Sequence, residues 1–347
     1  MSTKTAWRIC SAGSRAGRAA TAAAGLAVFA CSLLLPIRAA SAADADYPVK
    51  AVKPVEAAPF FTVNDNRLTY AYMFTGTDPG VAGTTAKQVV AFTHFDAWQY
   101  GTNFFNIDLL KSDHNDPSGP CPVTATGCAG VTEIYGLIRS TFGFNQIFNT
   151  KAFTMGPLRN VSLEVGADAN TKNSYLGSSK RDGVIGLQFA FDLPYKGYFN
   201  VAPLFYKETN HNAFLNGPLD PDGSTNFRGT WAIETNYYMD LKFLPDQFPL
   251  AFSGRAAWYG PKGTGTTNVI ANNIPTKTEF NSEQRLTLDV SKMAFGPTRS
   301  HFVDVWVAYR YWQNKFGLDH ENNVNCRGAK IDSCTESSLY SGVSVKF

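Results

Sequence analysis

The sequence predicts an all-β protein, a twelve-stranded antiparallel transmembrane β-barrel. Three observations support this fold class. After residue 42, the 347-residue chain contains no apolar run near the ~18 residues that a membrane-spanning helix needs. Twelve segments alternate between apolar and polar residues, as strands with one wetted face do. Short and long connections alternate between these segments, which is typical of outer-membrane barrels.

Residues 1–42 are predicted to be a signal peptide that is removed on export. Their basic residues include Lys4, Arg8, Arg15 and Arg18. The apolar run "AAAGLAVFACSLLLP" follows, and the small residues "ASA" at 40–42 offer a cleavage site. A retained membrane helix is the alternative, but the apolar run is short for one.

The rest of the chain divides into a tail and the barrel. Residues 43–65 are rich in Ala and Pro and predict an extended periplasmic tail before a barrel of residues 66–347. The leader holds five of the 31 basic residues and none of the 28 acidic ones, so the exported part is slightly acidic. We therefore expect no nucleic-acid partner.

Four cysteines follow the leader, in the two close pairs Cys121/Cys128 and Cys326/Cys334. Local disulfides are the natural interpretation in an exported protein. Metal ligation by these cysteines is the alternative, but no histidine lies at a matching spacing. We expect neither a metal nor a cofactor.

The twelve predicted strands have connections of unequal length. The second and third strands, and the sixth and seventh, are separated by only about three residues. Six other connections are long and carry all four cysteines. The strands are expected at 66–75, 88–97, 101–111, 131–142, 160–169, 183–193, 197–208, 228–241, 249–259, 281–292, 302–314 and 337–347.

The last predicted strand, "SLYSGVSVKF", alternates apolar Leu339, Val343, Val345 and Phe347 with mostly polar residues. A free edge strand of this kind would invite aggregation. Pairing of the last strand with the first closes a barrel and removes the edge. A terminal aromatic residue, Phe347, is also expected to present this strand to the outer-membrane assembly machinery.

Strand parity assigns side chains to the lipid or to the lumen. In 183–193, Ile185, Leu187 and Phe189 are expected to face lipid and Gln188 the lumen. A charge that faces lipid costs a few kcal/mol, so the charged set is expected inside. Twelve strands leave a narrower lumen than the 16–18 strands of wide porins, so a small solute would touch the lining.

Parity also selects the candidate pore-lining residues for substrate binding. Aromatic side chains can stack on a planar base, at about 1–3 kcal/mol each, and charged groups can bind polar edges. The alternative is that the inner charges only pair with one another across the lumen. The candidates are Asn106, Asp108, Glu133, Tyr135, Arg139, Trp306, Arg310 and Trp312. No residue is assigned a catalytic role.

Three stretches carry a resemblance to a known family. "WQYGTNFFNIDLL" (98–110), "TEIYGLIRSTFGF" (132–144) and "YRYWQNKFGLD" (309–319) resemble motifs of the Tsx-like nucleoside-specific channels. Lesser echoes are "GPLRNVSLEVGAD" (156–168) and "QRLTLDVSK" (284–292). The resemblance implies a twelve-stranded outer-membrane barrel that passes nucleosides and deoxynucleosides. The Pro/Ala tail and the cysteine-bearing loops depart from the family pattern.

The sequence therefore predicts a Gram-negative outer-membrane channel with periplasmic termini and nucleosides as its expected solute. A general narrow porin for sugars or other small polar solutes is one alternative, and a structural or adhesive barrel is another. An enzyme is not expected. The loop clusters "KSDHND" (111–116) and "LDHEN" (318–322) place Asp beside His, which can activate water, but both lie in long polar loops.

Overall fold

The computed structural model describes residues 59–121, 127–174, 179–211, 224–245, 247–263, 275–327 and 332–347. The chain divides into two units, Met1–Glu56 and Ala57–Phe347. The first unit, with the predicted signal peptide and most of the predicted tail, lies outside the described residues. None of the helices in the described ranges is long and apolar enough to cross a membrane.

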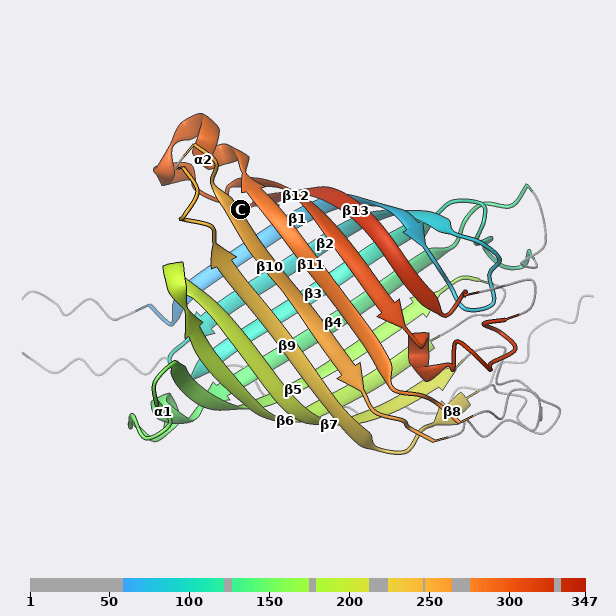
Figure 1. Cartoon of the computed structure of the whole chain (residues 1–347), viewed down its shortest axis with the longest axis horizontal. Helices are drawn as coiled ribbons and strands as arrows, with labels where there is room; N and C mark the ends of the chain where they lie inside the picture. The colour runs from blue at the N-terminus through green and yellow to red at the C-terminus, as the bar shows by residue number, and fades with distance from the viewer. Residues whose placement is uncertain are drawn as a thin grey trace, which may run out of the picture. The chain divides into compact units, whose positions relative to one another are not determined.

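Twelve long strands of the second unit form one antiparallel sheet (Figure 1). A thirteenth strand, β8 (Ser224–Asn226), is a short addition to the end of β7. The long strands are β1 (Phe61–Gly76), β2 (Thr85–Trp98), β3 (Gly101–Ser112), β4 (Thr132–Gly143), β5 (Leu158–Lys172), β6 (Ser179–Leu193), β7 (Gly197–His211), β9 (Thr230–Asp240), β10 (Leu250–Tyr259), β11 (Glu279–Asp289), β12 (Val303–Gln313) and β13 (Thr335–Lys346).

The sheet closes on itself. Each long strand pairs with the long strands before and after it in the chain, including β6 with β7. β7 pairs with β9, since β8 is only a short strand between them. The last strand pairs with the first, with Leu68 opposite Val345 and Tyr70 opposite Val343. This confirms the predicted twelve-stranded barrel and its closing pair. The ring leaves no unpaired edge among these twelve strands. Their backbone N–H and C=O groups therefore have hydrogen-bond partners within the sheet, which a membrane could not supply.

The two ends of the barrel differ. One end, here called the turn end, carries the β2–β3, β4–β5, β6–β7, β9–β10 and β11–β12 connections, and both Phe61 and Phe347 lie there. The other end, the loop end, carries the remaining connections and both disulfides. The short helices are α1 (Phe144–Ile147), η1 (Pro194–Lys196), α2 (Val290–Phe295) and η3 (Pro297–Arg299) at the turn end, and η4 (Lys315–Gly317) at the loop end.

Most exposed side chains of the outer face are apolar and most charged side chains face the lumen, as parity predicts. His94, Asp96 and Asn103 are a polar group on the outer face near the turn end. Ile185 on β6 is 50% exposed on the outer face. Gln188 on the same strand faces inward and donates a hydrogen bond to Glu164 of β5, at 2.8 Å. Exposed side chains of the outer face include Leu68, Tyr70, Ile107, Leu109, Ile134, Leu187, Phe205, Val307 and Val343. Such a band suits a lipid environment.

Several strand boundaries differ from the prediction by three to five residues, and two of them have a clear structural cause. β1 begins at Phe61, inside the predicted tail of 43–65, because its first residues pair with the end of β2, Val63 opposite Ala97. The strand predicted at 281–292 ends at Asp289. The Asp289 side chain accepts a hydrogen bond from the backbone of Lys292 and so starts α2, which takes Val290 out of the sheet.

Two of the connections predicted to be long are short. The β1–β2 connection spans 77–84 and the β5–β6 connection spans 173–178, because the flanking strands run further than their apolar patterning indicates. The disulfide predictions are confirmed. Cys121 pairs with Cys128, and Cys326 with Cys334, each within one loop-end connection.

Aromatic side chains gather where β2 turns into β3. The ring of Trp98 lies 5.4 Å from that of Tyr100, 5.9 Å from Phe60 and 6.2 Å from Phe142. Trp and Tyr are the residues that favour a membrane–water interface. The cluster thus marks the level at which the turn end would leave the bilayer.

Opposite faces of β6 should respond differently to an added charge. We expect Ile185→Arg to destabilise the barrel in a bilayer by about 2–4 kcal/mol, because Ile185 points at lipid midway along its strand. The control is Gln188→Arg, whose guanidinium would meet Glu164 in the lumen. Urea unfolding in vesicles measures both. Equal losses would contradict the assignment of faces.

Candidate functional site

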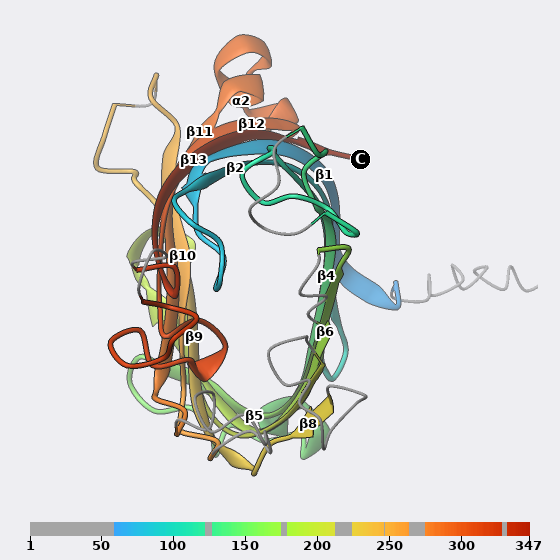
Figure 2. The ribbon, with the colours of Figure 1, turned by 90° about the vertical axis from the view of Figure 1, so that its right-hand side faces the viewer.

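An ion pair spans the lumen. Arg139 of β4 meets Glu234 of β9 through two hydrogen bonds, from Nε at 2.9 Å and from Nη2 at 2.7 Å. β4 and β9 lie on opposite walls of the oval ring in Figure 2. Asp168 of β5 accepts a further hydrogen bond from the same guanidinium. We call this Arg139–Glu234 pair the strut.

Glycine makes room for the strut. Gly166 on β5 lies directly opposite Arg139, and a Cβ atom there would come within 2.5 Å of the Arg139 Cδ. The absent side chain lets the arginine lie flat across β5 before it reaches the far wall. Tyr259 of β10 donates a 3.0 Å hydrogen bond to the Glu234 Oε1 and completes the pair.

The lumen on one side of the strut is packed with side chains. Tyr206 of β7 is fully buried there, and its ring lies 4.7 Å from that of Tyr259. The other members of this inward cluster are Val184, Ala202, Leu204, Ala232 and Ala257. The opposite side, past β1–β3 and β10–β13, holds a second inward cluster around Met73, Trp306 and Tyr340. A solute in the lumen would therefore pass beside both clusters.

The rest of that side presents arginines on one wall and polar residues on the other. Arg255 of β10 lies opposite Glu283 of β11, and Glu283 lies opposite Arg310 of β12. Across the lumen, Asp108 of β3 lies within electrostatic range of Arg255 and Arg310. These side chains other than Glu283 are half-buried, so solvent reaches them.

The β3–β4 wall holds five of the predicted pore-lining residues. Asn106 accepts a 2.7 Å hydrogen bond from Thr93 and donates one to Asp108. Tyr135 donates to Asp168 at 3.0 Å, and Glu133 accepts from Asn170 at 3.2 Å. All four face the lumen. The fifth is Arg139, which forms the strut with Glu234.

The two predicted tryptophans differ in their access to a solute. Trp306 is only 3% exposed, beneath the guanidinium of Arg285 at 3.9 Å from the ring centroid. Its Nε1 donates to Ser344, and Gly342 provides the space for its ring. Trp306 is thus a packed residue in this arrangement and offers no free face to a base.

Trp312 is half-buried near the loop end. Its Nε1 donates to Glu279 at 2.8 Å. Two cations lie against its ring, the Arg310 Cζ at 4.9 Å and the Lys315 Nζ at 4.6 Å from the centroid. Arg310 also meets Glu336 at 3.4 Å. Arg310 and Trp312 are therefore brought together, as a cation and an aromatic face.

The sequence analysis missed an aromatic residue in the lumen. Phe104 shares the inward face of β3 with Asn106 and Asp108, yet its ring is 36% exposed. It lies opposite Arg139 of β4 and Phe95 of β2. Parity alone would have found it, because it is two residues before Asn106. An apolar ring left open to an aqueous lumen is a candidate stacking surface.

The β1–β2 connection folds into the loop end of the lumen (Figure 2). Asp78 in this connection pairs with Lys87 of β2 at 2.8 Å and with Lys172 of β5 at 3.6 Å. Because β2 and β5 are separate parts of the wall, a carboxylate that reaches both must lie inside the barrel. Lys172 also pairs with Asp116 of the β3–β4 connection, at 3.4 Å.

A second contact fixes the other side of the same connection. The Lys315 Nζ bonds both the Thr77 backbone oxygen and the carboxylate of Glu336 on β13. The Thr77 backbone N–H donates to the same carboxylate at 3.2 Å. All these charged groups are buried. We call the contacts of Thr77 and Asp78 the latch, since they hold this connection across the loop-end mouth.

The Asp/His loop clusters have structural roles in the described residues. Asp116 is buried against Lys172, and Asp113 accepts from the Ala86 backbone at 3.0 Å. Asp319 accepts from the Glu321 backbone and from Asn322. These hydrogen bonds, and the contact with Lys277, hold the pKa of Asp319 below its usual value despite desolvation, which acts in the opposite direction.

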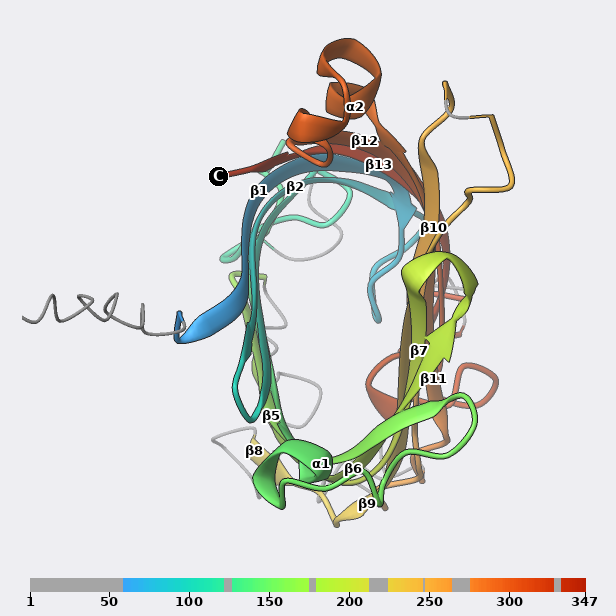
Figure 3. The same ribbon diagram turned by 90° about the vertical axis from the view of Figure 1, so that its left-hand side faces the viewer.

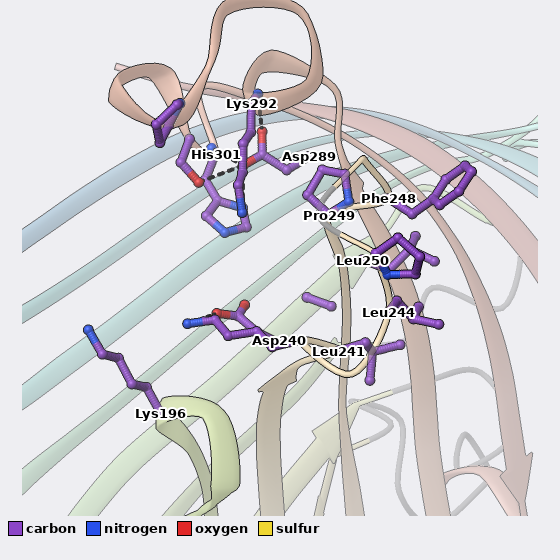
Figure 4. Close-up of a pocket in the computed structure, with 15 residues that line it drawn as sticks. Lys196, Asp240, Leu241, Leu244, Phe248, Pro249, Leu250, Asp289, Lys292 and His301 are labelled. Atoms are coloured by element: carbon purple, nitrogen blue, oxygen red, sulfur yellow. Dashed lines mark hydrogen bonds and ion pairs between the residues drawn. The ribbon is translucent and has the colours of Figure 1, made fainter.

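A cavity lies at the turn end, between η1 and the β9–β10 and β11–β12 connections (Figure 4). Asp289, His301 and Asp304 bring potential ligand atoms within 4.8 Å of one another beside it. The Asp289 carboxylate accepts hydrogen bonds from the Ser291 and Ser300 hydroxyls and from two backbone N–H groups. Asp304 accepts from Arg67 at 2.7 Å. The group is therefore a clasp of hydrogen bonds, and we assign it no metal.

His301 is the titratable member of this clasp. Its Nδ1 lies 3.1 Å from the Asp304 Oδ1. This hydrogen bond, more than the charge of the two aspartates, holds the pKa of His301 above its ordinary value although partial burial lowers it. The imidazolium is thus favoured near the turn end.

No family model and no curated protein sequence matches the chain. Among solved structures, the chain is similar to the NanC porin, at 11% identity and a TM-score of 0.41, over 82% of this chain and 100% of that one. It is similar to an outer membrane channel from Pseudomonas putida F1, at 12% identity and 0.44, over 85% and 98%. It is also similar to OccAB2 of Acinetobacter baumannii, at 11% and 0.31, over 83% and 98%. The likeness extends no further than barrel architecture, and the nucleoside resemblance stays a prediction.

The strut can be tested from both sides. Arg139→Gln and Glu234→Gln break the same contact, so both should raise single-channel conductance in a planar bilayer. Their effects on ion selectivity should be opposite. Arg139→Gln leaves Glu234 and Asp168 uncompensated and should favour cations, whereas Glu234→Gln should favour anions. Reversal potentials in a KCl gradient measure this.

The control is Arg159→Gln, an exposed arginine paired with Asp192 at the turn end. Arg159→Gln should change neither the single-channel conductance nor the ion selectivity. Shifts of the same sign from Arg139→Gln and Glu234→Gln would rule out the strut as a charged element of the pore.

Release of the latch should open the loop-end mouth. Asp78→Asn and Lys87→Gln each remove the 2.8 Å ion pair, and both should raise conductance and the frequency of current fluctuations. Asp113→Asn is the matched control, because Asp113 binds the backbone of Ala86 and has no contact with Lys87 or Lys172 among the described ion pairs. Unchanged currents in both latch variants would show that the β1–β2 connection does not narrow the pore.

Proposed function

We propose that the protein is an outer-membrane channel for passive diffusion of small polar solutes, with nucleosides as the expected class. The observation that carries this proposal is the closed barrel with an apolar outer face and a lumen of half-buried arginines, acids and aromatic rings. Such a barrel places a polar path through an apolar layer. Twelve strands keep that path narrow enough for the lining to touch a small solute.

Orientation in the membrane follows from the two ends. The turn end, with both ends of the barrel chain, would face the periplasm, and the loop end with its disulfides would face outward. Export by residues 1–42, a periplasmic segment up to β1 and recognition of the Phe347 strand by the assembly machinery belong to the same proposal. The oxidising side of the membrane suits the two disulfides.

A nucleoside has a planar base and a polar sugar, and the accessible lumen residues of β3, β10 and β12 offer partners for both. Phe104 presents an exposed ring for stacking, beside Asn106 and Asp108 on the same face of β3. Arg255 and Arg310 lie across from Asp108. Loose binding is what a channel needs, because a tightly held solute would not leave.

A general narrow porin is the second candidate. Its support is that most lumen charges already pair with one another, as in the strut and in the Arg285–Glu283 contact at 2.8 Å. Trp306 is also covered. A lumen of this kind sieves by size and charge without selecting a base.

Solute block of the current separates the two candidates. The protein without residues 1–42 is refolded into a planar bilayer and titrated with adenosine, thymidine and glucose. We expect the nucleosides to reduce conductance at concentrations where glucose has no effect. Conductance that is indifferent to nucleosides would favour the general porin, and the absence of any conductance would contradict the channel itself.

Phe104 and its neighbour offer a matched pair for locating the block. Phe104→Ala should weaken nucleoside block about fivefold or more, because stacking of a base on an aromatic ring contributes about 1–3 kcal/mol. Phe105→Ala removes the same ring from the outer face, where Phe105 packs against Phe92, and should leave the block unchanged. An equal effect of both variants would remove Phe104 from the site.

A further inference from the structure

An apolar projection lies beside the barrel at the turn end. In Figures 1 and 3, α2 lies outside the ring of strands, next to β11 and β12. Met293 and Phe295 of α2, and Phe302 just before β12, expose 51%, 70% and 42% of their surface. Together with the exposed Arg299 they are here called the α2 patch. Exposed aromatic and thioether side chains gathered in this way mark a binding surface.

The α2 patch is held in place by buried hydrogen bonds. Asp289 accepts from the Lys292 and His301 backbones, at both ends of the segment, and from the hydroxyl of Ser300. The Ser291 hydroxyl accepts from the backbones of Phe302 and Val303, both at 3.0 Å. The patch is thus presented in one conformation, although short helices are unstable alone.

The patch continues the apolar outer face. The Phe302 backbone oxygen accepts a 2.9 Å hydrogen bond from Lys346 at the end of β13, and Phe347 is exposed beside it. Val305 follows on the outer face of β12 and is exposed as well. A surface that contacts the apolar outer face therefore contacts the α2 patch without interruption.

The accessible charges of the segment are basic, because the two acids that flank it, Asp289 and Asp304, are buried and contact His301. Residues 290–302, "VSKMAFGPTRSHF", contain Lys292, Arg299 and His301 and no acid. The Arg299 Cζ lies 6.0 Å from the centroid of the Phe302 ring, so a cation is paired with an apolar ring at the same level. Basic and aromatic residues together favour the interface of a bilayer that contains anionic lipid.

We infer that the α2 patch binds anionic phospholipid in the leaflet at the turn end. Met293, Phe295 and Phe302 enter the boundary between headgroups and acyl chains, and Arg299 binds a lipid phosphate. This surface goes beyond the channel function and does not depend on which solute passes. It would anchor the β11–β12 connection, and with it the Asp289 clasp beside the cavity of Figure 4.

Environment-sensitive labels test the contact. Phe295→Cys, and separately Met293→Cys, are labelled with the fluorophore NBD in the folded protein without residues 1–42, with its disulfides intact. The protein is placed in vesicles of phosphatidylcholine alone or mixed with phosphatidylglycerol. We expect blue-shifted emission at both sites and strong quenching by spin-labelled lipid. Folding is checked by heat-dependent migration on a gel.

The matched control is Val324→Cys, a 50% exposed apolar residue of the loop-end β12–β13 connection, which should emit as in water. Quenching by spin-labelled phosphatidylglycerol should exceed that by phosphatidylcholine. Arg299→Gln should lower this preference by up to about fivefold, since one basic residue near an anionic surface contributes about 1 kcal/mol.

Three outcomes would overturn the inference. Water-like emission at both 293 and 295 would show that lipid does not cover the patch. A blue shift that disappears when residues 43–58 are deleted would identify that segment as the occupant. Equal quenching by both lipids, unchanged in Arg299→Gln, would leave only apolar contact and remove the phosphate from the site.

Discussion

A closed sheet with alternating side chains leaves a charged residue one favourable direction, into the lumen. Each of the twelve long strands is paired on both sides, so residues of one parity meet the surroundings of the barrel and those of the other meet the interior. Arg139, Glu234 and Arg255 all follow this rule, and each then needs a partner in a confined space. The strut, the latch and the Arg255–Glu283–Arg310 row each supply such partners, because a buried ion without a partner is costly.

In the proposed channel, this pairing would also shape the path of a solute. One side of the strut is packed around Tyr206, and the other combines a second packed cluster around Trp306 with half-buried polar groups. A solute in that channel would meet groups whose positions are already set by their partners, so it would exchange water for protein contacts with little reordering. Contacts of this kind are many and individually weak, which suits movement more than retention.

The strands and their faces were predictable because the period of two is local and repeats in every strand. The site was predictable only in part. Parity placed Asn106, Asp108 and Tyr135 on one wall, but burial of Trp306 depends on the register between β12 and β13, which sets Gly342 opposite its ring. Asp78 lies in a connection with no alternation at all. Contacts across the lumen join residues far apart in the chain, and no local pattern encodes them.

The strut has a mechanical consequence. The ring of strands is oval in Figures 2 and 3, and the Arg139–Glu234 pair joins its two nearer walls. The strut opposes the separation of those two walls, and the side chains packed around Tyr206 oppose their approach. In the proposed channel, the width of the path would therefore depend on these side chains as well as on the hydrogen-bonded sheet.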